Sequence, residues 1–264
     1  MFLQSVAKGA TVAIAVMGQV ASIGLDVIQN SEAKTDVMKH LKQIKVSAEI
    51  ISTNSRDNIV LFRDQRLFDV LALVNQGSAF IQEYTDASTP AKYHIKCNVP
   101  LCFDGALQSD KTKYVSFKID MTDEALSVGS TIDAYMLGSV AVGTEPLRIV
   151  ENRFRPKEST HLSLTGCDVL MYEHGMIDRA RYKSVTGMQT ELTDPEYDFY
   201  TNVLADIFVM PQDENGTART IPGYNLMPTT TFVDVEIEAG DLNSIPVYLL
   251  YKRYSNSQIP GCNC

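Results

Sequence analysis

Residues 114–121 (YVSFKIDM) carry the plainest secondary-structure pattern in the chain, because apolar and polar residues alternate strictly along them. Successive side chains of a β-strand point to opposite faces, so this alternation predicts a strand with one buried face and one wet face. The apolar set is Val115, Phe117, Ile119 and Met121, and the polar set is Ser116, Lys118 and Asp120. Residues 231–238 (TFVDVEIE) repeat the pattern with only Phe232 out of place, which predicts a second half-buried strand.

Further runs rich in β-branched and aromatic residues extend this pattern along most of the 264 residues. The predicted strands are 44–51, 58–63, 67–75, 79–84, 93–102, 113–121, 131–140, 160–164, 167–173, 182–190, 203–210, 229–238 and 246–254. A short helix or loop is expected over 194–200. Residues 143–158 (GTEPLRIVENRFRPKE) are charged and proline-bearing, which is typical of a connection between two β units.

Two blocks of about 110 residues each suit eight-stranded Greek-key sandwiches. The predicted fold is therefore mainly β, with two successive jelly-roll (β-sandwich) barrels after an N-terminal apolar α-helix. The predicted domains are a helical arm at 1–42, a first barrel at 43–152 and a second barrel at 153–264. One irregular sandwich in place of two barrels remains an open alternative.

The N-terminal segment contains 17 uncharged residues, Gly9 to Leu25, between Lys8 and Asp26. Its spacing allows one helix over residues 3–29, followed by a shorter helix over 32–42. The uncharged run lies at the lower end of the length needed to span a bilayer, and its Gly, Ala and Ser content makes it less apolar than a Leu-rich span. Three interpretations stay open: a helix packed on its own protein or a neighbour, a membrane contact, and an uncleaved export signal.

If this helix contacts lipid or a neighbouring subunit, its larger side chains are expected to form the contact. These residues are Phe2, Leu3, Val6, Lys8, Val12, Ile14, Val16, Ile23 and Leu25. An uncharged, small-residue surface of this size needs a partner, because soluble monomers rarely leave such a patch in water. The segment is therefore predicted to be an assembly element that lies against a membrane or a neighbouring subunit.

Sequence motifs for catalysis are absent: the chain has no GxGxxG, GxxxxGK[ST], GxSxG or HExxH. Its four histidines stand apart, Glu173–His174 reads as a polar turn, and Cys167 begins an apparent strand as a small hydrophobic residue would. We therefore predict a non-enzymatic protein without a cofactor. Asn215–Gly216 reads as a hairpin turn, and the acidic stretches 194–198 and 213–215 read as solvated loops more readily than calcium sites.

The five cysteines do not form a secreted disulfide framework, because their number is odd and the chain is long. A reducing compartment fits them better. Cys97 and Cys102 with Cys262 and Cys264 have spacings that miss the usual zinc motif, so free thiols are expected, with a disulfide or a zinc site as the alternatives.

A net charge of −9 and a pI near 4.9 disfavour nucleic acid as a specific partner. Basic residues nevertheless gather in two groups. They are Arg148, Arg153, Arg155 and Lys157, and then Arg179, Arg181 and Lys183. Acidic residues interleave with the first group, so surface or intersubunit ion pairs are predicted over a patch for nucleic acid or anionic lipid.

An apolar N-terminal helix followed by two small β barrels resembles the double jelly-roll major capsid proteins of tailless icosahedral bacteriophages that carry an internal membrane. The likeness is architectural, spans roughly residues 40–254 and includes the closing strand 245–254 (IPVYLLYKRY). It implies homotrimers whose six barrels form a pseudo-hexagonal tile, with residues 1–29 directed toward lipid. Barrels of about 110 residues leave little room for long tower loops, so a smooth outer surface is expected.

The resemblance implies a structural subunit that self-assembles in the host cytoplasm into an icosahedral virion capsid, over an internal membrane. Its partners would be itself, first as a homotrimer and then as a lattice, and other capsid proteins. The alternative function is a membrane-tethered β-sandwich surface or adhesive binding protein, which would be monomeric and would expose aromatic ligand grooves.

Overall fold

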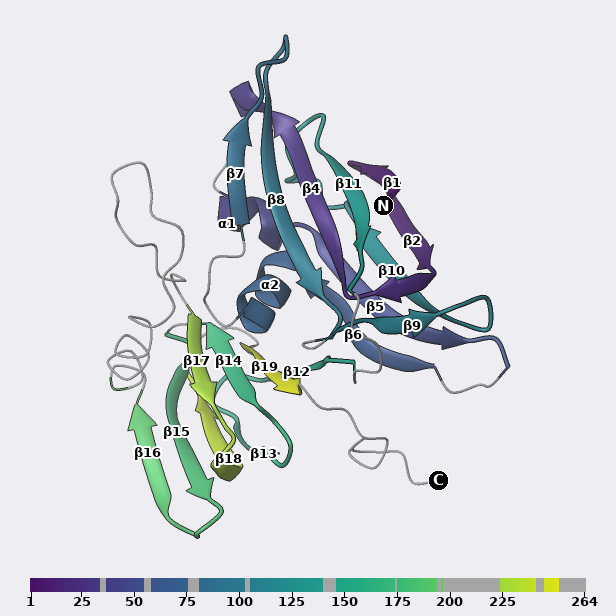
Figure 1. Cartoon of the computed structure of the whole chain (residues 1–264). Helices are drawn as coiled ribbons and strands as arrows, with labels where there is room; N and C mark the ends of the chain where they lie inside the picture. Colours follow the sequence, from purple (N-terminus) through teal and green to yellow (C-terminus); the bar gives the residue numbers. More distant parts are fainter. Residues whose placement is uncertain are drawn as a thin grey trace. The chain divides into compact units, whose positions relative to one another are not determined.

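The computed structural model describes residues 1–33, 37–54, 58–75, 81–102, 105–139, 146–173, 175–193, 196, 224–240 and 245–251. Within these ranges the chain is mainly β with antiparallel sheets, as predicted (Figure 1). It divides into two compact units, the first made of Met1–Val74 and Phe80–Arg148, the second of Asn75–Ala79 and Ile149–Cys264. The predicted boundary at residue 152 falls inside a strand that begins at Arg148.

The first unit contains two main sheets and a short strand pair. The five-stranded sheet has the order β1 (Phe2–Ala7), β11 (Thr131–Leu137), β4 (Ser22–Asn30), β8 (Lys92–Pro100) and β7 (Ile81–Thr85). The four-stranded sheet has the order β2 (Thr11–Val16), β10 (Lys113–Asp120), β5 (Lys45–Ser52) and β6 (Ile59–Arg66). The remaining elements are the pair β3 (Gly18–Val20) and β9 (Leu107–Ser109), the 3-10 turn η1 (Ser31–Ala33), and the helices α1 (Val37–Lys42) and α2 (Leu67–Asn75).

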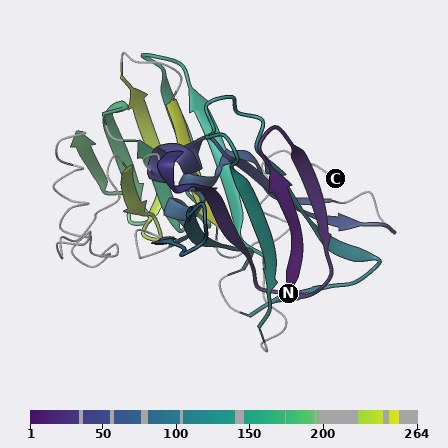
Figure 2. The same cartoon turned by 90° about the horizontal axis from the view of Figure 1, so that it is seen from above.

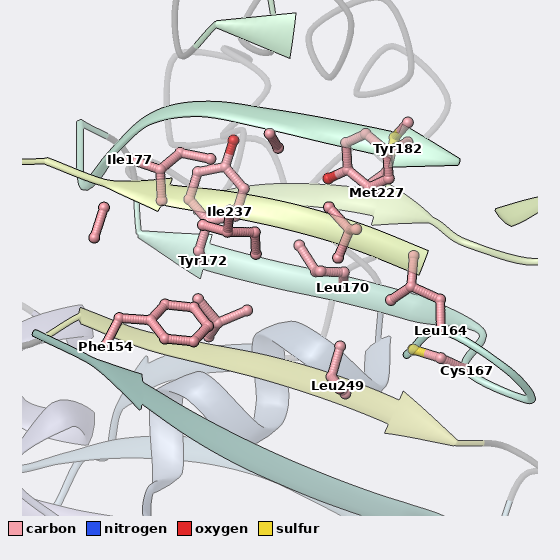
Figure 3. Close-up of a cluster of buried hydrophobic side chains, with 14 residues drawn as sticks. Phe154, Leu164, Cys167, Leu170, Tyr172, Ile177, Tyr182, Met227, Ile237 and Leu249 are labelled. Carbon is pink, nitrogen blue, oxygen red and sulfur yellow. The ribbon is translucent and has the colours of Figure 1, made fainter. Parts of the chain in front are cut away.

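The second unit contains two four-stranded sheets. One has the order β12 (Arg148–Phe154), β19 (Ile245–Tyr251), β14 (Val169–Glu173) and β17 (Tyr224–Pro228). The other has the order β13 (Ser159–Ser163), β18 (Phe232–Ala239), β15 (Ile177–Ser184) and β16 (Gln189–Thr193). Side chains from both sheets form one apolar cluster, in which Tyr172 and Leu170 of β14 lie toward Ile237 of β18 (Figure 3).

Both units pair their strands in the same nested way. Among the eight strands described in the second unit, the first pairs with the last, the second with the seventh, the third with the sixth and the fourth with the fifth. These pairs are β12 with β19, β13 with β18, β14 with β17, and β15 with β16. The first unit repeats the scheme when β3, β7 and β9 are set aside: β1 with β11, β2 with β10, β4 with β8, and β5 with β6. Strands three and eight, and four and seven, also pair in both units.

The predicted N-terminal helix over residues 3–29 is wrong, because these residues form β1 to β4 (Figures 1 and 2). The burial has a period of two: Ile14 and Val16 of β2 are buried, whereas Ala13 and Ala15 are exposed. Left-handed glycines, Gly9 (φ 85°) and Gly18 (φ 114°), break the uncharged run into short strands. Residues 2–30 therefore supply the strands β1 to β4 of the first unit and not a helical arm. Of the shorter helix predicted over 32–42, the described residues form the end of the 3-10 turn Ser31–Ala33 and the helix Val37–Lys42.

Three other predictions differ from the structure. Residues 67–75 form α2 and not a strand, because an apolar run that is buried on every side has no period that separates the two. Residues 148–154 of the predicted linker form β12. Residues 182–190 span the end of β15, a turn and the first two residues of β16. The predicted strand at 203–210, and all of 194–200 except residue 196, lie outside the described residues.

Replacement of Ile23 by alanine tests whether the N-terminal strands are core elements. Ile23 is fully buried in β4, so Ile23→Ala is expected to destabilise the first unit by about 2–5 kcal/mol through lost burial and a residual cavity. Hydrogen exchange of the β4 and β8 amides measures the free energy of unfolding for this unit alone. Val128→Ala, at a side chain 78% exposed, is the control and should stay within about 0.5 kcal/mol. An unchanged exchange rate in Ile23→Ala would contradict the strand assignment.

Candidate functional site

The outer face of the sheet β13-β18-β15-β16 carries a grid of polar and charged side chains. Inward residues of these strands, such as Tyr182, Val235 and Ile237, fill the core, so the alternate residues face outward. The strand register places the outward residues in three rows across the four strands. The rows are Ser159, Glu238, Arg179 and Thr193; His161, Glu236, Arg181 and Glu191; and Ser163, Asp234, Lys183 and Gln189. Hereafter this surface is called the charged face.

Arginine side chains on β15 tie together the acidic residues of the neighbouring strands. Arg179 Nε donates to Glu238 Oε2 at 2.5 Å, and its Nη1 lies 3.6 Å from Glu191 Oε1. Arg181 Nε donates to Glu191 Oε2 at 2.6 Å, and its Nη1 donates to Glu236 Oε2 at 3.1 Å. The acidic side chains along β18 therefore lie directly beside the basic side chains along β15. Opposite charges at paired positions of neighbouring strands stabilise a sheet.

The contacts of Arg181 shift the pKa values of Arg181, Glu191 and Glu236 in the directions that favour their charged forms. Hydrogen bonds from Arg181 lower the pKa of Glu191. A hydrogen bond from Ser159 and then one from Arg181 lower the pKa of Glu236, and both glutamates raise the pKa of Arg181. Such carboxylates stabilise the folded sheet above their ordinary pKa, and this contribution disappears as the pH falls through the lowered values.

A hollow of about 370 Å³ opens on the charged face, over the row that contains Arg181 and the row that contains Lys183. Its polar lining consists of His161, Arg181, Lys183, Gln189, Asp234 and Glu236, with Tyr182 beneath. His161 Nδ1 lies 3.4 Å from Asp234 Oδ1, and Lys183 is exposed. Because basic and acidic side chains both line the hollow, it suits a partner surface that also carries both basic and acidic groups.

A second polar cluster lies on the outer face of the five-stranded sheet of the first unit. His94 Nδ1 lies 3.0 Å from Asp26 Oδ1, and its Nε2 lies 3.5 Å from Asp86 Oδ2. The Tyr84 ring stacks on the imidazole at 4.6 Å, and Lys96 Nζ lies 4.9 Å from the centre of the Tyr84 ring. Asp86 also accepts hydrogen bonds from Ser88 and Lys92, which with His94 lower its pKa to about 2. The cluster holds the β7–β8 hairpin against β4.

The N-terminal contact residues predicted from the sequence divide by burial. Five of them have side chains buried within the first unit, namely Val6, Ile14, Val16, Ile23 and Leu25. Leu3, Lys8 and Val12 are half-buried and Phe2 is exposed, where its ring packs edge-on against Tyr135. Lys8 Nζ donates to loop carbonyls of Glu124 and Leu126. A contact role stays a prediction for the four residues that are not buried.

The described cysteines have the environment of buried apolar residues. Cys97, Cys102 and Cys167 are free and buried. Burial raises the pKa of Cys97 to about 12 and that of Cys167 to about 11, so both carry a protonated thiol. Cys262, Cys264, His174 and the acidic residues at 213–215 lie outside the described residues.

Sequence reasoning finds parts of the charged face but not the surface itself. The basic triplet Arg179, Arg181 and Lys183 is visible in the sequence. The ion pairs predicted for the basic groups are present at Arg179 and Arg181, and also at Arg153, whose Nε lies 2.6 Å from Glu151 Oε1. Asp234, Glu236 and Glu238 stand out there only as the wet side of a strand. The usable signal is that both triplets occupy alternate positions, because oppositely charged triplets of this spacing match when two strands pair.

Chemical labelling tests the state of the buried thiols. Cys97 and Cys167 are expected to resist iodoacetamide at pH 8 in the native chain, because only the thiolate attacks and the pKa of both is raised well above that pH. The same residues should react in denaturant, which is the control for the reagent. Peptide mapping by mass spectrometry measures the labelling, and rapid native labelling of Cys167 would contradict its buried, protonated state.

Across the described residues, no group of three or more His, Cys, Asp or Glu side chains is arranged to hold a metal ion. None of the helices in those same ranges has the length and apolar character needed to cross a bilayer.

The comparisons with known proteins give little to set beside this geometry. No protein-family model matches the chain, and no curated protein matches it. Among solved structures, the chain is similar to the PBSX exported protein XepA, at 11% sequence identity and a TM-score of 0.23, over 95% of this chain and 85% of that one. The likeness is too weak to carry a functional argument.

Proposed function

We propose that the chain is a structural subunit of a virion, a major capsid protein that self-assembles into an icosahedral shell from two jelly-roll barrels. The observation that carries this proposal is the nested strand pairing, first with last through fourth with fifth, found in both units. A long antiparallel ribbon that wraps into two facing sheets gives this order, and it is the ribbon of the jelly roll. Viral capsids, lectins and cupins share that architecture.

The duplication within one chain favours a shell subunit among these classes. The two units repeat one pairing scheme while their sequences show no residue-level repeat, so what they share is the arrangement of strands. Two barrels per chain and three chains per capsomer would give six barrels around one axis, a tile that packs in a plane. The proposed partners are therefore further copies, as homotrimers and then as a lattice, and other capsid proteins.

The chemistry of the described residues supports a non-enzymatic role. The buried thiols of Cys97 and Cys167 are held protonated, and the imidazole of His94 is used structurally, since it joins Asp26 of β4 to Asp86 beneath the stacked ring of Tyr84. Three free cysteines are compatible with assembly in the reducing host cytoplasm. Residues 1–29 retain Phe2, Leu3, Lys8 and Val12 as surface for lipid or a neighbouring subunit.

The alternative is a β-sandwich surface or adhesive binding protein. Exposed rings on the outer face of the first unit favour it, since Tyr84 and Phe2 are 37% and 54% exposed beside polar groups. Rings with neighbouring hydrogen-bonding groups are suited to ligand recognition. The N-terminal helix that would have tethered such a protein is replaced by strands.

Sedimentation velocity and negative-stain electron microscopy of the purified full chain test the proposal. We expect trimers at low protein concentration and closed shells or hexagonal tiles as concentration rises, because shell contacts are individually weak and act together. Buffer without and with phospholipid vesicles separates self-assembly from assembly on a membrane. A chain that remains monomeric throughout the series and binds glycans or vesicles as a monomer would favour the adhesive alternative.

A further inference from the structure

We propose that the charged face is a contact between two copies of this chain, which meet face to face about a two-fold axis that runs along the strands between β18 and β15. The proposal rests on the proposed function only in requiring many copies in one place, since a two-fold pair can form without a shell. It assigns a role to a surface that the nested strand pairing leaves unexplained.

The charged face is built of columns with alternating sign. Asp234, Glu236 and Glu238 form an acidic column along β18, and the neighbouring strand β15 carries a basic column in register with it. The members of the basic column are Lys183, Arg181 and Arg179, opposite the three acids in that order. The outer columns hold His161 on β13 and Glu191 on β16, both in the middle row.

A two-fold axis between the central columns places each acid over a base. The rotation exchanges the two columns while it keeps each row in place. Glu238 then faces Arg179 of the second copy, Glu236 faces its Arg181, and Asp234 faces its Lys183. The outer columns exchange in the same operation, so His161 faces Glu191 of the second copy. Every contact occurs twice, as an isologous interface requires.

Other face-to-face orientations are opposed by the same charges. With a two-fold axis across the strands, through the middle row, the acidic column would meet the acidic column of the second copy, and the basic column would meet the second copy's basic column. Like charges in direct contact cost several kcal/mol. The pattern therefore selects one orientation, which is the usual contribution of charge to an interface, whereas affinity depends on other terms.

The charged groups keep capacity for a second partner. The side chains of Arg179, Arg181 and Glu191 are 38%, 36% and 46% exposed in spite of their ion pairs within the chain. Each of these groups has two intrachain partners, but a guanidinium has five N–H donors and a carboxylate about four acceptor sites, so two partners do not saturate either group. Lys183 enters none of the ion pairs found among the described residues, and it lines the hollow with Asp234.

The dimensions of the face predict a weak contact. Strands lie about 4.8 Å apart and successive outward rows about 7 Å apart, so four columns and three rows cover roughly 400 Å² per copy with their side chains. Interfaces of this size are transient on their own. Facing sheets keep their strand directions within about 30° of each other, so the middle row stays aligned and the long side chains of the outer rows can reach across.

Charge reversal on the full chain tests the contact. Lys183→Glu and Asp234→Lys each create two like-charge contacts per two-fold pair, so each variant alone should self-associate at least about tenfold more weakly than the parent chain. An equimolar mixture of the two variants should regain association close to that of the parent. In a mixed pair, one contact joins the introduced carboxylate at position 183 to the introduced ammonium group at position 234, and the other joins Asp234 to Lys183 as in the parent. Sedimentation velocity measures the association at low and high NaCl, and high salt should weaken the parent and the mixture alike.

Controls separate the contact from folding and from the proposed function. Lys118→Glu, on the outer face of β10 in the first unit, changes the net charge as Lys183→Glu does and should leave association unchanged. Circular dichroism melts of each variant verify the fold.

Rescue by mixing supports the inference, since charges within each chain are the same before and after mixing. Shells that form equally well from every variant would overturn the inference and leave the capsid proposal standing, whereas rescued pairs that never form shells would support the inference and count against a capsid. Folded single variants that fail to associate when mixed would overturn it.

Discussion

The pairing of the first strand of each unit with its last strand is the constraint on which the rest of the structure depends. β1 finds its hydrogen-bonding partner in β11, with Phe2 opposite Tyr135, and β12 finds its partner in β19. Buried backbone groups need such partners, so neither sheet is complete until distant parts of the chain meet. Every inner pair then nests inside the outer one. This explains why an N-terminal segment without charges belongs to the core: it supplies strands to both main sheets of the first unit.

In a unit of two packed sheets, only the inner face of each sheet is buried in the core, so the outer face can carry charged side chains. Tyr182 and Ile237 point into the core of the second unit, while Arg181 and Glu236 on the same two strands point outward. A one-residue slip between β15 and β18 would bring the arginines inward and break the match of acidic and basic columns. The charged face therefore also fixes the register of the strands that form it, at little cost because the groups remain partly hydrated.

The sequence predicted the fold wherever polar residues marked the wet face of a strand. Residues 114–121 and 231–238 alternate charged with apolar residues, and both are strands of the expected facing. Residues 11–16 (TVAIAV) alternate too, but alanine and threonine mark their wet face, so the run resembles a small-residue helix. In α2 all faces are buried, and no period remains to be detected. The members of the charged face were visible as residues, whereas their assembly into a grid depends on pairing between strands some fifty residues apart, which no local pattern encodes.

The overall charge of the chain gives the charged face a further importance. At a net charge of −9, two copies repel each other over a distance of about a Debye length, roughly 10 Å at 0.1 M salt. The charged face carries three basic residues and four acidic ones, so its local balance is close to neutral while the chain as a whole is strongly acidic. Copies that approach through this face meet less repulsion than copies that approach through an acidic surface. Long-range repulsion and short-range complementarity thus select the same face, and because Arg179 and Arg181 are already held by their intrachain partners, little side-chain entropy remains to be lost when a second copy arrives.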